Sequence, residues 1–143
     1  MPNAVIVDAV RTPVGRRNGK LSGWHAVDLA AAPLKALVER NDLDPALVED
    51  VIMGCTMTVG EQAMNIGRNA VLAAGYPESV PSTTIDRQCG SSQQALHFAA
   101  QGVMAGAFRA GTRSTWPPRR CERSWSATTS TRRSSRTSSW AAR

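Results

Sequence analysis

A change of composition after residue 108 decides how much of this chain can build a hydrophobic core. Residues 109–143 contain no Val, Ile, Leu, Met or Phe, and Arg, Ser, Thr, Trp and Pro dominate them. Burial of apolar side chains offsets the entropy that a chain loses on folding, so we expect this segment to be disordered. The core must therefore come from residues 1–108, which we interpret as one domain.

The net charge is concentrated in the same C-terminal segment. Residues 1–108 carry 8 Lys and Arg against 10 Asp and Glu, a net charge of −2, whereas residues 109–143 carry 9 Arg against 1 Glu, a net charge of +8. Together they give the +6 of the whole chain. The basic character is thus a property of the segment that cannot form a core.

Two interpretations of residues 109–143 are open. In the first, the arginines contact phosphates while Trp116, Trp125 and Trp140 stack on bases, so that the segment is a nucleic-acid-binding tail. In the second, it is translated from a shifted reading frame, because GC-rich codons for Val, Ala and Gly read one or two bases late encode Ser, Arg, Trp, Pro and Ala. We favour the shifted frame because the change is abrupt, and we expect no nucleic-acid partner.

Apolar patterns in the first 108 residues predict strands that alternate with helices. Continuous apolar or β-branched runs predict buried strands, and apolar residues at helical spacing predict helices. The predicted strands are residues 4–10, 51–55 and 81–86, and the predicted helices are residues 25–41, 61–74 and 89–108. This order is typical of an α/β fold.

Single residues refine the ends of these elements. Pro33 is expected either to kink the first helix or to mark a later start for it. Asp44 and Pro45 have the character of a helix start, and Gly75 that of a helix end. The last helix presents a dense apolar face for burial, which includes Leu96, Ala99, Ala100, Val103, Met104 and Ala107.

Cys89 is the candidate nucleophile. It lies where the predicted strand 81–86 gives way to a helix, and the small residues Gly90, Ser91 and Ser92 allow a substrate to approach closely. Unpaired N–H groups and the dipole at a helix start favour a thiolate and can hold an oxyanion. A cysteine near a helix start is also commonly a small buried hydrophobe, so the residues alone leave both roles open.

The other candidate residues are assigned non-catalytic roles. Cys55 ends a predicted strand and is interpreted as structural. His25 is interpreted as a helix-start or surface residue, and His97 lies about 12 Å along the helix from Cys89, too far to serve as its base. Three polar side chains at helical spacing predict a solvated or subunit-facing side; they are Gln62, Asn65 and Arg68.

The cysteines and the N-terminus indicate a compartment. Cys55, Cys89 and Cys121 include no C-x-x-C metal or redox motif. We find no pattern of a signal peptide and no apolar run of the ~20 residues that span a bilayer. We therefore expect a cytoplasmic protein without a membrane partner.

The segment around Cys89 resembles the nucleophile segment of the thiolases. That pattern has a hydrophobe, a small polar residue, two free positions, the cysteine, and small residues that lead into a helix. The matching residues here are Ile85, Asp86, Arg87, Gln88, Cys89, Gly90, Ser91, Ser92, Ala95, Leu96 and Val103. Asp86 departs from the Asn, Ser or Thr of many members, and Gln93 replaces a common hydrophobe. The tripeptide at residues 11–13, Arg-Thr-Pro, also resembles one that follows the first thiolase strand, and Gln62, Asn65 and Arg68 resemble a thiolase segment close to the subunit interface.

The resemblance covers residues 1–108 and implies a partial N-terminal domain. The implied fold is α/β: an incomplete N-terminal half of a thiolase-type mixed sheet with helices on both faces, followed by the disordered segment 109–143. In a complete half, the fourth of five strands lies next to the first. Without it, the first strand keeps an unpaired apolar edge, so we expect an unstable, aggregation-prone chain.

The resemblance also implies a function. A thiolase cleaves a 3-ketoacyl-CoA with coenzyme A, or condenses acetyl-CoA units, through an acyl group carried on the nucleophile, here Cys89. Coenzyme A is then a substrate, no resident cofactor is expected, and the intact family form is a homo-oligomer of fatty acid metabolism. The Gly-His-Pro, Cys-x-Gly and Asn-Glu-x-x-x-His motifs that complete the family's site are absent from this sequence. We therefore expect the 143-residue chain alone to be inactive.

Two alternatives stay open at this point. One is a related condensing enzyme of the ketoacyl synthase type, which shares the fold and a nucleophilic cysteine. The other is a non-catalytic interaction module whose basic tail binds nucleic acid, for which salt-dependent binding to DNA is the expected sign.

Overall fold

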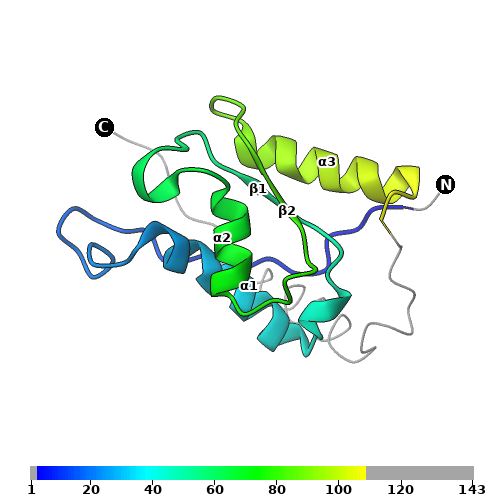
Figure 1. Cartoon of the computed structure of the whole chain (residues 1–143), viewed down its shortest axis with the longest axis horizontal. Helices are drawn as coiled ribbons and strands as arrows, with labels where there is room; N and C mark the ends of the chain where they lie inside the picture. The colour runs from blue at the N-terminus through cyan, green and yellow to red at the C-terminus, as the bar shows by residue number, and fades with distance from the viewer. Residues whose placement is uncertain (1–2, 109–143) are drawn as a thin grey trace, which may run out of the picture.

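Two short parallel strands lie at the centre of the protein in a computed structural model, which describes residues 3–108 (Figure 1). Strand β1 (Val51–Gly54) pairs with strand β2 (Ser82–Ile85), with Val51 opposite Ser82 and Gly54 opposite Ile85. Helix α2 (Ile66–Ala73) lies between them in the chain and completes a β-α-β unit. Two further backbone hydrogen bonds, from Val51 to Pro81 and from Cys55 to Ile85, continue the ladder at both ends.

Helices cover both faces of this small sheet, as expected. Helix α3 (Ser91–Ala105) packs against β1 and β2 from one side, and α2 packs against them from the other (Figure 1). Helix α1 (Ala26–Asn41) packs on α2 and forms an outer layer. Two 3₁₀ turns, η1 (Pro45–Leu47) and η2 (Gly60–Gln62), complete the described elements.

The core lies between α1, α2 and the residues that follow α2. Its buried members are Val38, Val71, Tyr76 and Val80, with Leu34, Leu43, Val48, Val51 and Ala74 packed around them. The Tyr76 hydroxyl donates a hydrogen bond to the carbonyl of Leu34 across 3.0 Å. Burial raises the pKa of the Tyr76 phenol above its ordinary value of 10.0.

The raised pKa of Tyr76 predicts that the domain loses stability at alkaline pH. The folded domain holds the phenol proton at pH values where the unfolded chain has lost it, so the free energy of unfolding falls as the pH rises above about 10. We expect the Tyr76→Phe variant to lose about 1 kcal/mol at neutral pH with its hydrogen bond. Urea unfolding at neutral and at alkaline pH tests this. An equally steep alkaline loss in both proteins would contradict it.

Polar side chains at and before the start of α2 tie this region to β2 and to neighbouring loops. Asn65 caps α2 by accepting from the N–H of Arg68 (3.0 Å), and its amide donates to the carbonyl of Ser82 (2.7 Å). The Arg68 guanidinium donates to the carbonyls of Val80 and Glu78, and Gln62 accepts from the thiol of Cys55. Gln62, Asn65 and Arg68 are half-buried and bond to backbone and side-chain partners within the domain, and their solvated or subunit-facing position stays a prediction.

Arg68 is expected to contribute strongly to stability. The Arg68→Met variant leaves the two carbonyls without their charged donor, and we expect a loss of about 2–3 kcal/mol in the free energy of unfolding. Urea denaturation measures the loss. Arg17→Met is the matched control, since Arg17 is exposed in a loop, and a similar loss in both variants would argue against a specific role.

The helix ends follow local capping. The His25 Nδ1 atom accepts from the N–H of Val27 (3.2 Å) and caps α1, which confirms the helix-start role. Helix α1 continues through Pro33, so the alternative of a later start is wrong. Helix α2 begins five residues later than predicted, because Met64 has a left-handed φ of 61° and Asn65 forms the cap. Gly75, with φ 80°, follows the end of α2 as predicted.

The predicted strand at residues 4–10 is wrong. The segment has no regular structure, and the side chains of Val5 and Ile6 are 76% and 81% exposed. An apolar run becomes a strand only beside another strand, and within residues 3–108 no segment pairs with this one. The apolar pattern therefore predicts a strand, but without a partner strand the segment does not form one.

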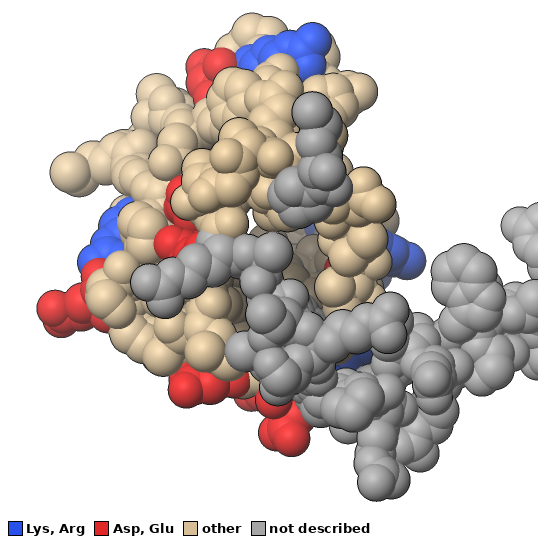
Figure 2. Space-filling model, turned by 90° about the vertical axis from the view of Figure 1, so that its right-hand side faces the viewer, with Lys and Arg blue, Asp and Glu red and all other residues tan. Residues whose placement is uncertain are grey.

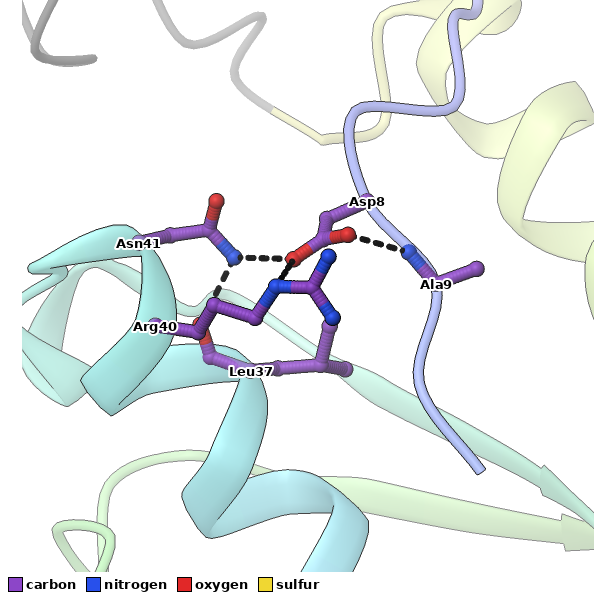
Figure 3. A network of polar contacts seen from close by, with 5 residues as sticks. All are labelled: Asp8, Ala9, Leu37, Arg40 and Asn41. Atoms are coloured by element: carbon purple, nitrogen blue, oxygen red, sulfur yellow. Dashed lines mark hydrogen bonds and ion pairs between the residues drawn. The ribbon is translucent and has the colours of Figure 1, made fainter. Parts of the chain in front are cut away.

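Asp8 anchors this first segment to the end of α1 (Figure 3). Its carboxylate accepts from the Asn41 amide at 2.9 Å and from the Ala9 N–H at 2.8 Å, and it pairs with Arg40 Nε at 3.3 Å. The hydrogen bonds from Asn41 and Ala9, with a smaller effect of the Arg40 charge, lower the pKa of Asp8. The segment is thus held by polar contacts at one residue.

Large apolar side chains remain exposed on several elements. In Figure 2, most of the surface that grey atoms leave visible is uncharged. The exposed residues include Val5, Ile6, Leu96, Phe98 and Met104. The predicted burial of Leu96 and Met104 on α3 is wrong, because α3 contacts the sheet mainly through its first turns, where Ser91 and Ala95 are buried. Aggregation of the chain stays a prediction that this surface supports.

Candidate active site

Cys89 lies in the tight turn that joins β2 to α3. The N–H of Gly90 donates to the carbonyl of Arg87 (2.8 Å), so residues 87–90 form a β-turn with Cys89 in its third position. Cys89 is exposed and has a φ of 60°, in the left-handed region. That conformation costs a non-glycine residue about 1–2 kcal/mol. The turn therefore holds a cysteine in a conformation that glycine would adopt more easily. Strained backbone conformations of this kind are often found at residues with a chemical role.

The first turn of α3 offers open hydrogen-bond donors beside Cys89. Gly90 is the N-cap residue and supplies no side-chain cap. Within residues 3–108, the backbone N–H groups of Ser91, Ser92 and Gln93 have no acceptor. Helix starts of this kind stabilise negative charge, including that of an oxyanion. The arrangement of strand, strained turn and helix start suits a nucleophile that attacks a carbonyl.

Ser91 supports the turn from the helix side. Its side chain is buried, with the residue 6% exposed. The hydroxyl donates to the carbonyl of Arg87 (2.9 Å) and accepts from the N–H of the same residue (3.1 Å). Sequence patterns did not single out Ser91, which resembles any other small residue at a helix start.

Gly54 supports the same turn from the sheet side. A Cβ atom on Gly54 would overlap the backbone of Ser91 and Ser92. The end of β1 and the first turn of α3 therefore touch through their main chains. A glycine that closes an apolar strand was the sequence signal for such a close approach.

The side chains of the remaining candidates make other contacts or are exposed. The thiol of Cys55 is bonded to Gln62 (3.2 Å) and to the carbonyl of Met57 (3.5 Å). His97 is exposed on α3, eight positions beyond Cys89. Asp86, at the position that departs from the thiolase pattern, is exposed and accepts a hydrogen bond from the Gln88 amide (2.7 Å). No histidine is therefore placed as the base for Cys89 within the described residues.

The described part of the chain contains neither a metal-binding cluster nor a membrane-spanning helix. Among residues 3–108, no group of three or more His, Cys, Asp and Glu side chains is arranged to hold a metal ion. No helix in that range has the length and apolar content to cross a membrane. The basic segment 109–143, with its two interpretations and its expected disorder, lies outside the described residues.

Comparison with known proteins agrees with this geometry. The family model for the thiolase N-terminal domain matches residues 4–112, so the match ends close to the change of composition. The steroid 3-ketoacyl-CoA thiolase FadA6 of Mycobacterium tuberculosis is 58% identical over 106 residues, which are 74% of this chain and 26% of that protein. The beta-ketoadipyl-CoA thiolase of Escherichia coli is 51% identical over 107 residues, or 74% of this chain and 27% of that one.

A solved structure shows the same fold. The acetyl-CoA acetyltransferase of Bacillus anthracis superposes with a TM-score of 0.68 at 40% sequence identity, over 76% of this chain and 27% of that one. The chain belongs to the thiolase family, and its matched part is the N-terminal domain. It spans about a quarter of the length of the relatives it matches. These similarities favour a thiolase over a ketoacyl synthase or a basic interaction module.

Proposed function

We propose that residues 1–108 supply the nucleophile of a thiolase-type acyltransferase that acts on 3-ketoacyl-CoA. The Cys89 thiolate attacks the keto carbon, and the bond between that carbon and the adjacent CH₂ breaks. The electron pair and a proton go to the CH₂ group, so that acetyl-CoA leaves and a shortened acyl group remains on sulfur. The thiol of coenzyme A then attacks the thioester, and the Cys89 thiol is restored. The reverse direction condenses two acyl-CoA molecules.

The conformation of Cys89 is the observation that carries this proposal. An exposed thiol is held at a φ of 60° immediately before an uncapped helix start. Covalent catalysis there divides one difficult carbon–carbon cleavage into two acyl transfers. Open N–H groups beside the sulfur provide hydrogen bonds for the developing oxyanion.

The proposal assigns coenzyme A the role of substrate and requires no resident cofactor. By the family resemblance, the acid and base of the reaction belong to the Gly-His-Pro and Cys-x-Gly motifs. This sequence contains neither motif, and its two histidines are His25 and His97. The 143-residue chain alone therefore does not complete thiolysis in this proposal. The complete enzyme is a homo-oligomer of cytoplasmic fatty acid metabolism, a compartment that suits the free thiols of Cys55 and Cys89 in residues 3–108, and needs neither nucleic acid nor membrane as a partner.

A chimera tests the proposed function. Residues 1–108 replace the matching segment of the FadA6 relative, which supplies the rest of a thiolase. We expect the chimera to cleave a 3-ketoacyl-CoA in the presence of coenzyme A, with an acyl group recoverable on Cys89 by mass spectrometry. A folded chimera that neither cleaves the substrate nor carries acyl groups on Cys89 would overturn the proposal.

A further inference from the structure

We propose that Ser91 is a positioning residue that locks the turn presenting Cys89. This inference rests on the function proposed for Cys89. Ser91 touches no reacting atom in this role. It acts through the backbone of Arg87, which opens the turn.

The lock consists of three hydrogen bonds that meet at one residue. The Ser91 hydroxyl binds both the N–H (3.1 Å) and the carbonyl (2.9 Å) of Arg87. The same carbonyl accepts the turn-closing bond from the N–H of Gly90 (2.8 Å). Rotation of the peptide on either side of Arg87 therefore breaks a bond to Ser91, and these bonds hold the three residues between Arg87 and Ser91 in their conformation.

The strain at Cys89 explains why such a lock is needed. A non-glycine residue in the left-handed region tends to relax, and the surroundings must hold it there. Because Ser91 is 6% exposed, its hydroxyl has no water to replace Arg87 as a partner. Relaxation of the turn would leave the buried Ser91 hydroxyl without a hydrogen-bond partner. Only in the strained conformation do all groups of the lock form their hydrogen bonds.

The neighbouring serine provides a matched control. Ser92 carries the same side chain one position further along α3, but it is exposed and makes no hydrogen bond through its hydroxyl within residues 3–108. The Ser91→Ala and Ser92→Ala variants of the full chain remove the same atom. They differ in whether the turn loses its lock.

The first readout is the reactivity of each cysteine in the folded chain. After brief treatment with iodoacetamide, trypsin releases Cys55, Cys89 and Cys121 in the separate peptides 41–68, 88–109 and 121–123. We expect Ser91→Ala to lower the alkylation rate of Cys89 relative to Cys55 by about three- to tenfold, because the thiol leaves the helix start. Ser92→Ala should leave the ratio unchanged. An unchanged or higher ratio in Ser91→Ala, or a rise at both cysteines that marks general loosening, would overturn the proposal.

A double-mutant cycle separates the lock from ordinary stability. Glycine adopts a positive φ at little cost, so Cys89→Gly removes the strain that Ser91 resists. With Cys89 present, loss of the lock lets the turn relax and releases strain that offsets part of the lost hydrogen-bond energy, so we expect Ser91→Ala to lower the urea midpoint less with Cys89 present than with Cys89→Gly. Equal effects in both backgrounds would show that Ser91 only stabilises the fold. Neither readout requires thiolysis, so failure of the lock is distinguishable from failure of the proposed function in the chimera.

Discussion

Thiolysis by the chimera falls by about 10⁴-fold or more when Cys89 is replaced by serine. Serine has nearly the same size and can adopt the same turn, so the fold should persist. Its hydroxyl gives up a proton far less readily than a thiol and does not form the labile thioester on which the second step depends. Steady-state rates of 3-ketoacyl-CoA cleavage measure the loss, and circular dichroism verifies the fold.

The other thiol of the described domain is the control for this result. Cys55 is bonded to Gln62 in the loop after β1, and we expect Cys55→Ser to keep activity within about threefold, since a hydroxyl accepts and donates in the same place. Substantial activity in Cys89→Ser, or an equal loss in Cys55→Ser, would contradict the assignment of Cys89.

The Gly54→Ala variant loses at least about 3 kcal/mol of stability and populates unfolded chain under conditions where the parent is folded. The added Cβ would overlap main-chain atoms of Ser91 and Ser92, which cannot turn aside as a flexible side chain can. Gly54 has no left-handed φ, so the penalty comes from the contact and not from the backbone conformation. Urea unfolding followed by circular dichroism measures the change.

A second glycine distinguishes this contact from a general effect of glycine replacement. A Cβ on Gly23 would meet no heavy atom within 4 Å, and Gly23 also lacks a left-handed φ. Gly23→Ala should therefore leave the urea midpoint unchanged or raise it slightly, because alanine restricts the unfolded chain. If both variants unfold alike, β1 and α3 do not meet through their main chains.

Local sequence signals predicted the elements that local interactions build. The strands β1 and β2, the start of α1 at His25 and the end of α2 at Gly75 follow from β-branched runs and capping residues close in sequence. The prediction of a strand at residues 4–10 was wrong because a strand forms only beside a partner strand, and the residues of the segment itself do not show whether one is present. The start of α2 was predicted too early because Met64 adopts a left-handed conformation, which the sequence of a non-glycine residue does not indicate.

The candidate site divides in the same way. The small residues around Cys89 and the thiolase pattern predict it as the nucleophile. The contributions of Ser91 and Gly54 depend on contacts between β1, β2 and α3, which come from separate parts of the sequence. Such supporting residues carry no distinctive chemistry of their own, so only the assembled fold identifies them.

The left-handed conformation of Cys89 has a consequence for how this gene would drift. Glycine relieves the strain at that position, so a descendant freed from acyl transfer would not be destabilised by exchanging its cysteine for glycine. Folding alone gives selection no reason to keep the thiol. A cysteine at this position in a diverging lineage would therefore record continued selection for chemistry, and a glycine there would mark its end.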